Sequence, residues 1–417
     1  MTSMPAIPLR WFVPLLLGVC PLSAATSSAE EPRGALLLIG GSERDDNRLL
    51  WDEFVRLAGG PGATVAVFPT ASNNPERTGR LYAEFFVKLG LKSVVVPLSA
   101  RLGEGDVRAL AYDADWVHRV RSSNAVFLAG GEQRRYRAAL VNADGKNTPM
   151  LDAIWHVYRQ GGLICGTSAG MAVMSRIMYA DAEFNLPVML NGAVMGREAD
   201  VGLGFVPKDW FVDQHFLARG RFARSLVAMR QYGFPYGLGI DEDTAVVIEQ
   251  GRRARVVGYR GALILDASAA VSDPQEPRFN LRNVRLSYLS HGDEIDLFTR
   301  SVTVAPEKTD EFRIDPFAPG FKPYYLTKQF YNDMVANMML LEVMYKLIDS
   351  PHDEATGLVF DGAAAKSQTT TPGFEFTFRR TRESIAWESP TAPGDAHTVL
   401  NVFLDIRPIT VRGPLYE

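Results

Sequence analysis

The segment from Gly162 to Met171 carries the clearest chemical signal in the chain, because a short apolar run ends in Gly-x-Ser-x-Gly and helix-forming residues follow it. This order predicts a strand, a sharp turn and a helix, which is the layout of a nucleophile elbow with Ser168 at its apex. The glycines leave room beside a serine whose backbone is strained. The helix expected from Ala169 would direct its first amides toward the turn, where they can stabilise an oxyanion. A glycine-rich turn that cradles phosphate is the alternative, so a mechanism also needs a histidine and an acid.

One of the six histidines, His215, lies in sequence that differs from the surroundings of the other five. It follows a short aromatic run at 210–212, and its neighbours are an acid, an amide and three arginines: Asp213, Gln214, Arg219, Arg221 and Arg224. Such a dense polar cluster between apolar flanks is a candidate site. The alternative is the solvated start of a helix, in which Arg221 and Arg224 share one face because they are three residues apart.

Three consecutive carboxylates, Asp241, Glu242 and Asp243, end a strand-like run and come after the serine and the histidine in the chain. Acidic residues at a strand end are often only turn formers. In the order serine, histidine, acid, however, a buried carboxylate can orient the imidazole and stabilise its cation, which lets the histidine take the serine proton. The residues alone leave open which of the three would face the histidine.

These segments together resemble the cyanophycinases, which belong with the peptidase E-like serine peptidases. The resemblance covers about residues 34 to 270 and rests on four short motifs. They are Gly-Gly-Glu-Gln at 130–133, Gly-Thr-Ser-Ala-Gly at 166–170, Asp-Gln-His-Phe at 213–216 with the arginines that follow, and Gly-Ile-Asp-Glu-x-Thr-Ala at 239–245. The histidine motif with its arginine run is much more specific than the glycine motifs, which wider relatives share.

The resemblance implies a role for each residue of the site. Ser168 would be the nucleophile, His215 the base and Glu242 the orienting acid, although Asp243 stands where the family usually has asparagine. The backbone amides of two further residues, Gly131 and Ala169, would hold the oxyanion. Six side chains would line the substrate pocket: Gln133, Asp213, Gln214, Arg219, Arg221 and Arg224. No metal or other cofactor is implied.

The activity implied by the resemblance is hydrolysis of cyanophycin, multi-L-arginyl-poly-L-aspartate, to β-Asp-Arg dipeptides by a secreted serine peptidase. The polymer presents alternating guanidinium and carboxylate groups, and arginine–carboxylate pairing suits the three arginines after the histidine. Three alternatives stay open. They are a peptidase E-like aspartyl dipeptidase, a catalytically inactive polymer-binding protein, and an amidotransferase, which would normally carry cysteine in place of Ser168.

Composition narrows the function classes. The chain has 417 residues and a formal net charge of −4, so it lacks the basic field expected of a general nucleic-acid binder. Neither His-Glu-x-x-His nor clustered cysteine occurs, which argues against a metal hydrolase. Apart from the pair that leads into the serine strand, three Gly-Gly pairs occur at 40–41, 59–60 and 130–131. None of them fits a nucleotide loop, and we expect turns.

The N-terminus predicts export. Arg10 precedes an apolar run at 11–19, and small residues follow at 23–29, which is the pattern of a secretory signal peptide over residues 1–29. The apolar run is too short to span a bilayer comfortably, so no membrane anchor is expected. Removal of the leader would leave Cys165 as the one cysteine. The secreted protein, extracellular or periplasmic, would therefore have no internal disulfide.

Between residues 34 and 178, apolar strand-like runs alternate with helix-like segments, which predicts an α/β fold with a mostly parallel sheet covered by helices. The resemblance implies the class I glutamine amidotransferase-like form of this fold, as in peptidase E. We expect residues 30–270 to be the catalytic domain and residues 271–417 a C-terminal extension integral to the core, with a separate polymer-binding module as the alternative. The Met-rich segment 326–348 predicts a helix that packs on the core or on a second subunit, which leaves a homodimer open.

Overall fold

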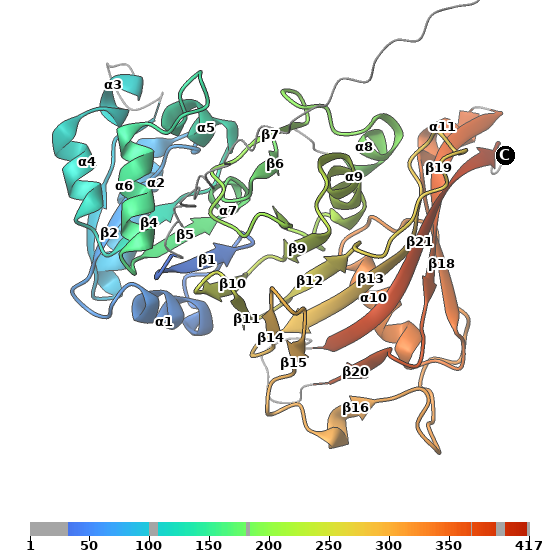
Figure 1. Ribbon diagram of the computed structural model, residues 1–417. Helices are drawn as coiled ribbons and strands as arrows, with labels where there is room; N and C mark the ends of the chain where they lie inside the picture. Colours follow the sequence, from blue (N-terminus) through green and yellow to red (C-terminus); the bar gives the residue numbers. More distant parts are fainter. Residues whose placement is uncertain (1–31, 100–106, 181–183, 368, 389–396, 415–417) are drawn as a thin grey trace, which may run out of the picture. The chain divides into compact units, whose positions relative to one another are not determined.

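The computed structural model of the chain describes residues 32–99, 107–180, 184–367, 369–388 and 397–414. The predicted leader, residues 1–29, lies outside these ranges. Within them the backbone forms a nine-stranded sheet, a ten-stranded sheet and a pair of short strands (Figure 1). The short pair consists of β6 (Ile177–Tyr179) and β7 (Ala199–Val201).

Five strands form the parallel half of the nine-stranded sheet. They pair in the order β1-β5-β4-β2-β3. Their bounds are β1 (Ala35–Ile39), β2 (Thr64–Phe68), β3 (Lys92–Val95), β4 (Ala125–Leu128) and β5 (Leu163–Thr167). Every residue of β1, β4 and β5 is buried, as continuous apolar strands become in a sheet that is covered on both faces. The α/β fold expected from the alternating pattern is therefore confirmed.

Helices cover both faces of this parallel half. Helices α1 (Arg48–Leu57) and α2 (Pro75–Lys88) pack on one face. The other face packs on α3 (Val107–Ala111), α4 (Ala114–Arg121), α5 (Arg134–Leu140) and α6 (Pro149–Arg159). Four of these helices follow an N-cap residue whose side chain accepts a hydrogen bond from a backbone N–H of the first turn. This capping explains why the helices start at these positions. The four capping residues are Asn47, Asn74, Asp113 and Thr148.

The same sheet continues beyond β1 with antiparallel strands. Strand β10 (Thr244–Glu249) pairs with β1, and β11 (Arg253–Gly258), β14 (Glu294–Asp296) and β15 (Val302–Thr303) follow in that order. The parallel pairing expected from the sequence thus applies to five of the nine strands. The difference arises because the chain returns beside β1 as a hairpin once it has passed the three carboxylates at 241–243.

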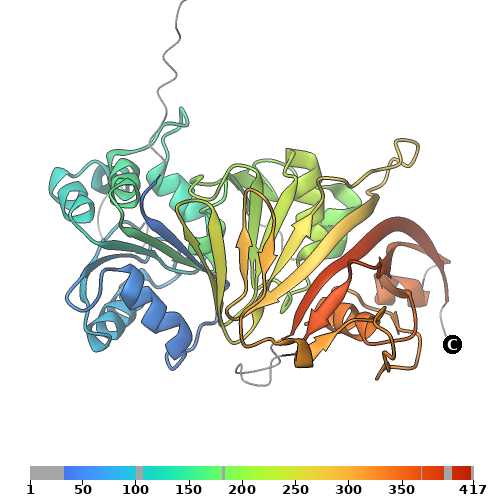
Figure 2. The ribbon, with the colours of Figure 1, turned by 60° about the horizontal axis from the view of Figure 1, so that its bottom comes forward.

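The ten-stranded sheet begins with the strands around the candidate histidine and ends in the C-terminal region (Figure 2). Strands β8 (Trp210–Gln214) and β9 (Tyr236–Ile240) are parallel and are connected through α9 (Phe222–Tyr232). The sheet continues from β9 through six further strands, which are β12 (Gly261–Asp266), β13 (Leu281–Ser290), β21 (Thr398–Arg412), β19 (Thr370–Arg379), β18 (Glu354–Phe360) and β17 (Phe330–Tyr331). Strand β20 (Ile385–Trp387) pairs with β21, and β16 (Arg313–Ile314) pairs with β20. The C-terminal region therefore lengthens the sheet that carries β8 and β9.

The Met-rich segment forms a shorter helix than its apolar spacing predicts. Helix α10 covers Met339–Ile348 and not residues 326–348. Part of the segment before α10 belongs to the sheet instead, because Phe330–Tyr331 forms β17 and pairs with β18. Met334 is buried against Gly357, where an added Cβ would lie 2.1 Å from the Met334 side chain. The apolar side of α10 packs into the same core cluster as strands β18, β19 and β21.

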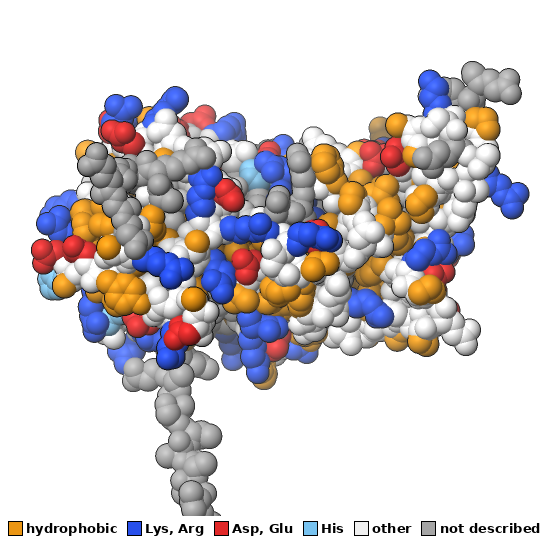
Figure 3. All heavy atoms as spheres, turned by 90° about the horizontal axis from the view of Figure 1, so that it is seen from above, with side chains coloured by type: hydrophobic (Ala, Val, Ile, Leu, Met, Phe, Trp, Pro, Cys, Tyr) orange, Lys and Arg blue, Asp and Glu red, His pale blue; other side chains and the backbone are white. Residues whose placement is uncertain are grey.

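The remaining helices are short, and charges are mixed on the surface. They are α7 (Ala169–Ala172), α8 (Asn185–Asn191), α11 (Gly362–Ser367) and a 3-10 turn at Asp310–Phe312. Basic and acidic side chains are interspersed on the face seen from above, and basic side chains gather toward its middle (Figure 3). In the described part of the chain, no helix is long and apolar enough to cross a bilayer. The same residues contain no group of three or more His, Cys, Asp and Glu side chains placed to bind a metal ion.

Removal of residues 271–417 should prevent stable folding, which tests the prediction that the extension is integral to the core. Strand β12 would lose its six-residue ladder with β13, and the apolar cluster under β13, β19 and β21 would open to water. We expect the truncated chain to be insoluble or to lack a cooperative thermal transition, with the chain from residue 30 to 417 as the matched control. A soluble truncated chain that unfolds cooperatively would show instead that the extension is a detachable module.

Candidate active site

Ser168 lies at the turn between β5 and α7, as the Gly-x-Ser-x-Gly pattern predicts. Its φ of 51° is in the left-handed region, where a residue other than glycine is strained. The two glycines of the motif allow very close packing. A Cβ on Gly166 would lie 2.2 Å from the carbonyl oxygen of Gly170, and a Cβ on Gly170 would lie 2.0 Å from the carbonyl oxygen of Leu128. The turn that exposes the serine therefore requires glycine at both positions.

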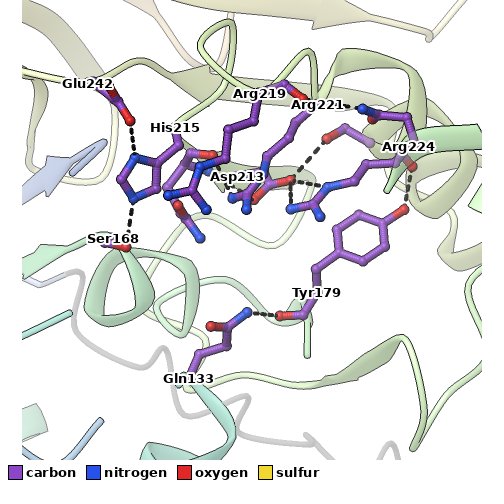
Figure 4. A network of polar contacts seen from close by, with 12 residues as sticks. Gln133, Ser168, Tyr179, Asp213, His215, Arg219, Arg221, Arg224 and Glu242 are labelled. Carbon is purple, nitrogen blue, oxygen red and sulfur yellow. Dashed lines mark hydrogen bonds and ion pairs between the residues drawn. The ribbon is translucent and has the colours of Figure 1, made fainter. Parts of the chain in front are cut away.

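Three side chains from separate parts of the chain form a hydrogen-bonded row (Figure 4). Ser168 Oγ lies 2.9 Å from His215 Nε2, and His215 Nδ1 lies 2.7 Å from Glu242 Oε1. Ser168 follows β5 of the nine-stranded sheet, whereas His215 and Glu242 follow β8 and β9 of the ten-stranded sheet. The structure thus brings together the serine, histidine and acid that the sequence singled out.

The two other carboxylates of the 241–243 segment are engaged elsewhere. Asp241 is buried, and its Oδ1 accepts the amide of Ala218 at 3.1 Å. Asp243 accepts the side chain of Arg44, with 2.6 Å between Nε and Oδ2. In this geometry Glu242 is the carboxylate that faces the histidine, and the aspartate in place of the family's usual asparagine leaves that contact intact.

The last residue of β1 and the two residues after it hold all three segments of the row through backbone hydrogen bonds. The consecutive carbonyl oxygens of residues 39–41 accept the amides of Ser168, His215 and Asp243 at 3.0, 2.9 and 2.9 Å. Gly41 has a φ of 109°, and a Cβ there would lie 2.4 Å from the imidazole. Sequence reasoning treated this Gly-Gly pair as an ordinary turn and missed its role. The available signal was its position directly after a buried strand, as for the serine.

Burial lowers the pKa of His215 below its ordinary value of 6.5, and the positive charge of Arg219 lowers it further, against the raising effect of Glu242. A neutral imidazole can accept a proton from the serine hydroxyl. Cys165, three residues before the serine, has a different character. It is fully buried in β5, and burial raises the pKa of its thiol well above the ordinary value, so the reactive thiolate is disfavoured.

The two residues expected to hold an oxyanion lie on either side of the serine. Ala169 is the first residue of α7, where a helical amide has no partner within the helix. Gly131 follows β4, and among the described residues its amide has no backbone acceptor. A Cβ on the preceding residue, Gly130, would lie 3.4 Å from the Cβ of Ser168. The glycine loop therefore lies against the serine.

Three of the residues predicted to line the pocket form a buried network of ion pairs. Asp213 Oδ2 accepts Nε and Nη2 of Arg224 at 3.0 and 2.7 Å, and Oδ1 lies 3.4 Å from Nη1 of Arg221. The side chains of Asp213 and Arg224 are each only 2% exposed. The Arg224 guanidinium also lies over the ring of Tyr179, 4.4 Å from its centroid. Because arginines already surround this carboxylate, it orients them and offers no free oxygen to a ligand.

The other predicted pocket residues differ in their accessibility. Arg219 is exposed, and its side chain extends toward His215 in Figure 4. Gln133 approaches from the opposite side, where its Nε2 donates to the carbonyl oxygen of Tyr179 at 2.5 Å. Gln214 is buried, and its Oε1 has no hydrogen-bond partner within the described part of the chain. The surroundings of the serine thus combine an exposed cation with amide groups, which suits a ligand rich in carboxylates and peptide bonds.

Comparison with known proteins agrees with this geometry. A sequence model of peptidase family S51 matches residues 36–256, which include all three members of the row. The chain is 34% identical to the cyanophycinase of Synechococcus elongatus over 295 residues, or 69% of this chain and 86% of that protein. It is 33% identical to the cyanophycinase of Geminocystis herdmanii over 272 residues, or 63% of this chain and 93% of that protein.

A solved structure also aligns with the chain. It is the crystal structure of a peptidase from an acI-B1 Actinobacterium, which is 20% identical and gives a TM-score of 0.47 over 64% of this chain and 98% of that chain. The family match covers more than half of the 417 residues, and the similarity to cyanophycinases extends over most of their length. The chain therefore belongs to peptidase family S51 and is a serine-type hydrolase.

Proposed function

We propose that the chain hydrolyses cyanophycin, multi-L-arginyl-poly-L-aspartate, to β-Asp-Arg dipeptides. The observation that carries this proposal is the row of Ser168, His215 and Glu242, joined by contacts of 2.9 and 2.7 Å. The similarity to cyanophycinases supports the choice of substrate. We also propose that residues 1–29 are removed on export, so that the enzyme meets the polymer outside the cytoplasm.

In the proposed reaction, neutral His215 takes the proton of Ser168 Oγ while Oγ attacks a backbone carbonyl carbon of the polymer. Negative charge develops on the carbonyl oxygen, and the amides of Gly131 and Ala169 donate hydrogen bonds to it. The imidazolium, stabilised by Glu242, then gives its proton to the leaving amine. Water attacks the acyl-enzyme by the same route, with the histidine again as the base, and this step frees the serine.

Recognition of the substrate would rest on the groups around the serine. Exposed Arg219 would pair with a substrate carboxylate beside the reacting bond. Gln133 and Gln214 would exchange hydrogen bonds with the backbone or side-chain amides of the polymer. Buried Asp213 would act indirectly, because its ion pairs hold the neighbouring arginines in fixed positions.

Two other functions use the same site. An aspartyl dipeptidase would use the triad on short peptides, and a polymer-binding protein would have lost turnover. Labelled cyanophycin, Asp-initiated dipeptides and a serine-directed probe separate the three functions. Release of dipeptides from the polymer supports the proposal, turnover of dipeptides alone supports the dipeptidase, and polymer binding without probe labelling supports the binding protein.

Ser168→Ala should lower kcat on cyanophycin by about a thousandfold or more while the protein still binds the polymer, because the nucleophile is lost without loss of packing volume. Dipeptide release and polymer co-sedimentation measure the two effects. Cys165→Ala is the matched control and should keep near-normal kcat. Loss of activity in the cysteine variant, with activity kept in the serine variant, would place the nucleophile elsewhere.

Glu242→Gln should lower kcat by roughly a hundredfold to ten-thousandfold, because the amide cannot stabilise the imidazolium and favours the wrong tautomer. Asp243→Asn is the matched control in the neighbouring residue. Its effect should be much smaller, since Asp243 pairs with Arg44 and not with the histidine. Initial rates at saturating substrate measure both variants. The reverse order of effects would identify Asp243 as the orienting acid.

The pH dependence of kcat/KM should show an acid limb below pH 6.5. The histidine must be neutral to act as a base, and burial and Arg219 lower its pKa, so activity should persist as the pH falls through 6.5 and decline only at the lowered pKa. Arg219→Gln should move this limb upward, toward 6.5, whatever it does to the height of the profile. An acid limb at or above 6.5 in the unaltered enzyme would contradict this account.

A further inference from the structure

A cavity adjoins the candidate triad on the side of its acid. It has a volume of about 990 Å³, and Glu242 is one of its lining residues. The catalytic region contributes Arg44 and Arg260 to the lining, and the C-terminal extension contributes Tyr325, Tyr345 and Lys346. None of these five residues belongs to the site predicted from the sequence. The cavity thus exists only because the extension packs beside the acid.

This cavity continues along the extension. A further cavity of about 540 Å³ shares Tyr325 and Tyr345 as lining residues and reaches Lys322 and Tyr324. We call these two neighbouring cavities together the tail track, lined from Glu242 through Tyr325 and Tyr345 to Lys322. The two cavities lie side by side at these shared tyrosines, an arrangement that suits an extended ligand better than a single dipeptide.

Aromatic rings form a row along the track. The rings of Tyr324 and Tyr325 lie 5.0 Å apart, and those of Tyr325 and Tyr345 lie 6.0 Å apart, each pair close to perpendicular. Tyr324 is 78% exposed, which is unusual for so large a ring without a binding partner. Tyrosine faces are favourable surfaces for planar guanidinium groups. Within the row, Lys346 Nζ already lies 5.4 Å from the centroid of the Tyr325 ring, and His397 stacks on Tyr345 with centroids 4.0 Å apart. The rings thus already accept a cation, and the row suits a ligand with arginine side chains.

Charges of both signs accompany the rings. Lys346 Nζ lies 2.6 Å from Glu342 Oε1, and Arg260 Nη1 lies 3.4 Å from buried Asp241. The carboxylates of Asp349 and Glu388 line the far part of the track, near Lys322. Cations and carboxylates therefore occur together along its length. A ligand with a single sign of charge would meet repulsion somewhere, whereas a polymer with one carboxylate and one guanidinium in each unit can pair with both.

We propose that the tail track is an exosite that binds a segment of the polymer other than the segment being cut. This inference rests on the proposed function, since it takes the polymer as the substrate. The two sites share Glu242 as a boundary, so one chain can occupy the serine site and the track at once. A bound second segment raises the local concentration of cleavable bonds and keeps the enzyme on the insoluble polymer between cuts.

The test compares the polymer with a fragment of two β-Asp-Arg units, which is too short to fill both sites. The variant Tyr325→Ala/Lys346→Ala, in the full-length enzyme, should raise the KM for the polymer about tenfold, as expected when two contacts of moderate strength are lost. Its kcat/KM on the fragment should stay within twofold of the unaltered enzyme. Tyr324→Ala, at an exposed position that tolerates substitution, should raise the polymer KM less. Tyr112→Ala/Lys208→Ala, at exposed positions that line neither cavity, is the matched control.

The possible results lead to different conclusions. An unchanged KM for the polymer in both track variants would overturn the exosite. Equal losses on polymer and fragment would also overturn it, because they would show that the substitutions disturb the triad through Glu242. Failure of the unaltered enzyme to release dipeptides from either substrate would instead overturn the proposed function. Co-sedimentation of Ser168→Ala with the polymer, weakened by the track substitutions, would support the exosite independently of turnover.

Discussion

The end of strand β1 is the constraint on which the arrangement of the site depends. Three consecutive carbonyl oxygens there bind the backbone amides of the serine turn, the histidine and the acid loop. These hydrogen bonds are directional, so the three loops cannot shift independently of one another. Gly41 brings the imidazole against the backbone, because any side chain at that position would occupy the space of the ring. The nucleophile on one sheet and the base on the other thus share one anchor.

The buried ion pairs beside the histidine also help to fix the position of its segment, although burying these charges costs desolvation energy. Asp213 lies two residues before His215, at the end of β8, and Arg224 lies on α9. Loss of one partner from a buried pair typically costs about 3–5 kcal/mol, because the other charge remains without compensation. The network therefore ties the end of β8 to α9 firmly. It also keeps positive charge near the histidine, which favours the neutral form of the imidazole.

Local patterns in the sequence predicted much of the site, and contacts between distant segments account for the rest. The serine turn and the alternating strands and helices follow from glycine placement and apolar spacing, which depend on near neighbours. The choice among the carboxylates at 241–243 depends on Arg44 and Ala218, which lie elsewhere in the chain. The same applies to Gly41, whose neighbour is a histidine more than 170 residues away. The burial of Asp213 could not be predicted from the sequence either, because an acid next to arginines is more often exposed to solvent.

Tertiary pairing also explains where the fold differs from its apolar pattern. Apolar residues at helical spacing in residues 326–338 predict a helix. Phe330 and Tyr331 instead pair with the edge of β18, and Gly357 leaves room for the Met334 side chain. A sheet edge with unpaired amides is a strong competitor for such a segment. The antiparallel half of the nine-stranded sheet has the same kind of cause, because β10 pairs with the edge of β1 that β5 does not occupy. Helix propensity determines the local structure of a segment only where no such pairing partner is available.

Two contacts of different kinds join the extension to the catalytic region. Phe222 of α9 packs edge-on against Phe376 of β19, with ring centroids 5.5 Å apart, and such pairs add about 0.5–1.5 kcal/mol beyond the burial of their area. Lys308 and Asp293, both fully buried and 2.7 Å apart, bond together with Thr398 of β21. The first contact supports the helix that carries Arg224, and the second fastens the last long strand to the turn before β14. The extension thus shares its core with the helix that carries Arg224, and the second contact fixes β21 beside the antiparallel half of the other sheet.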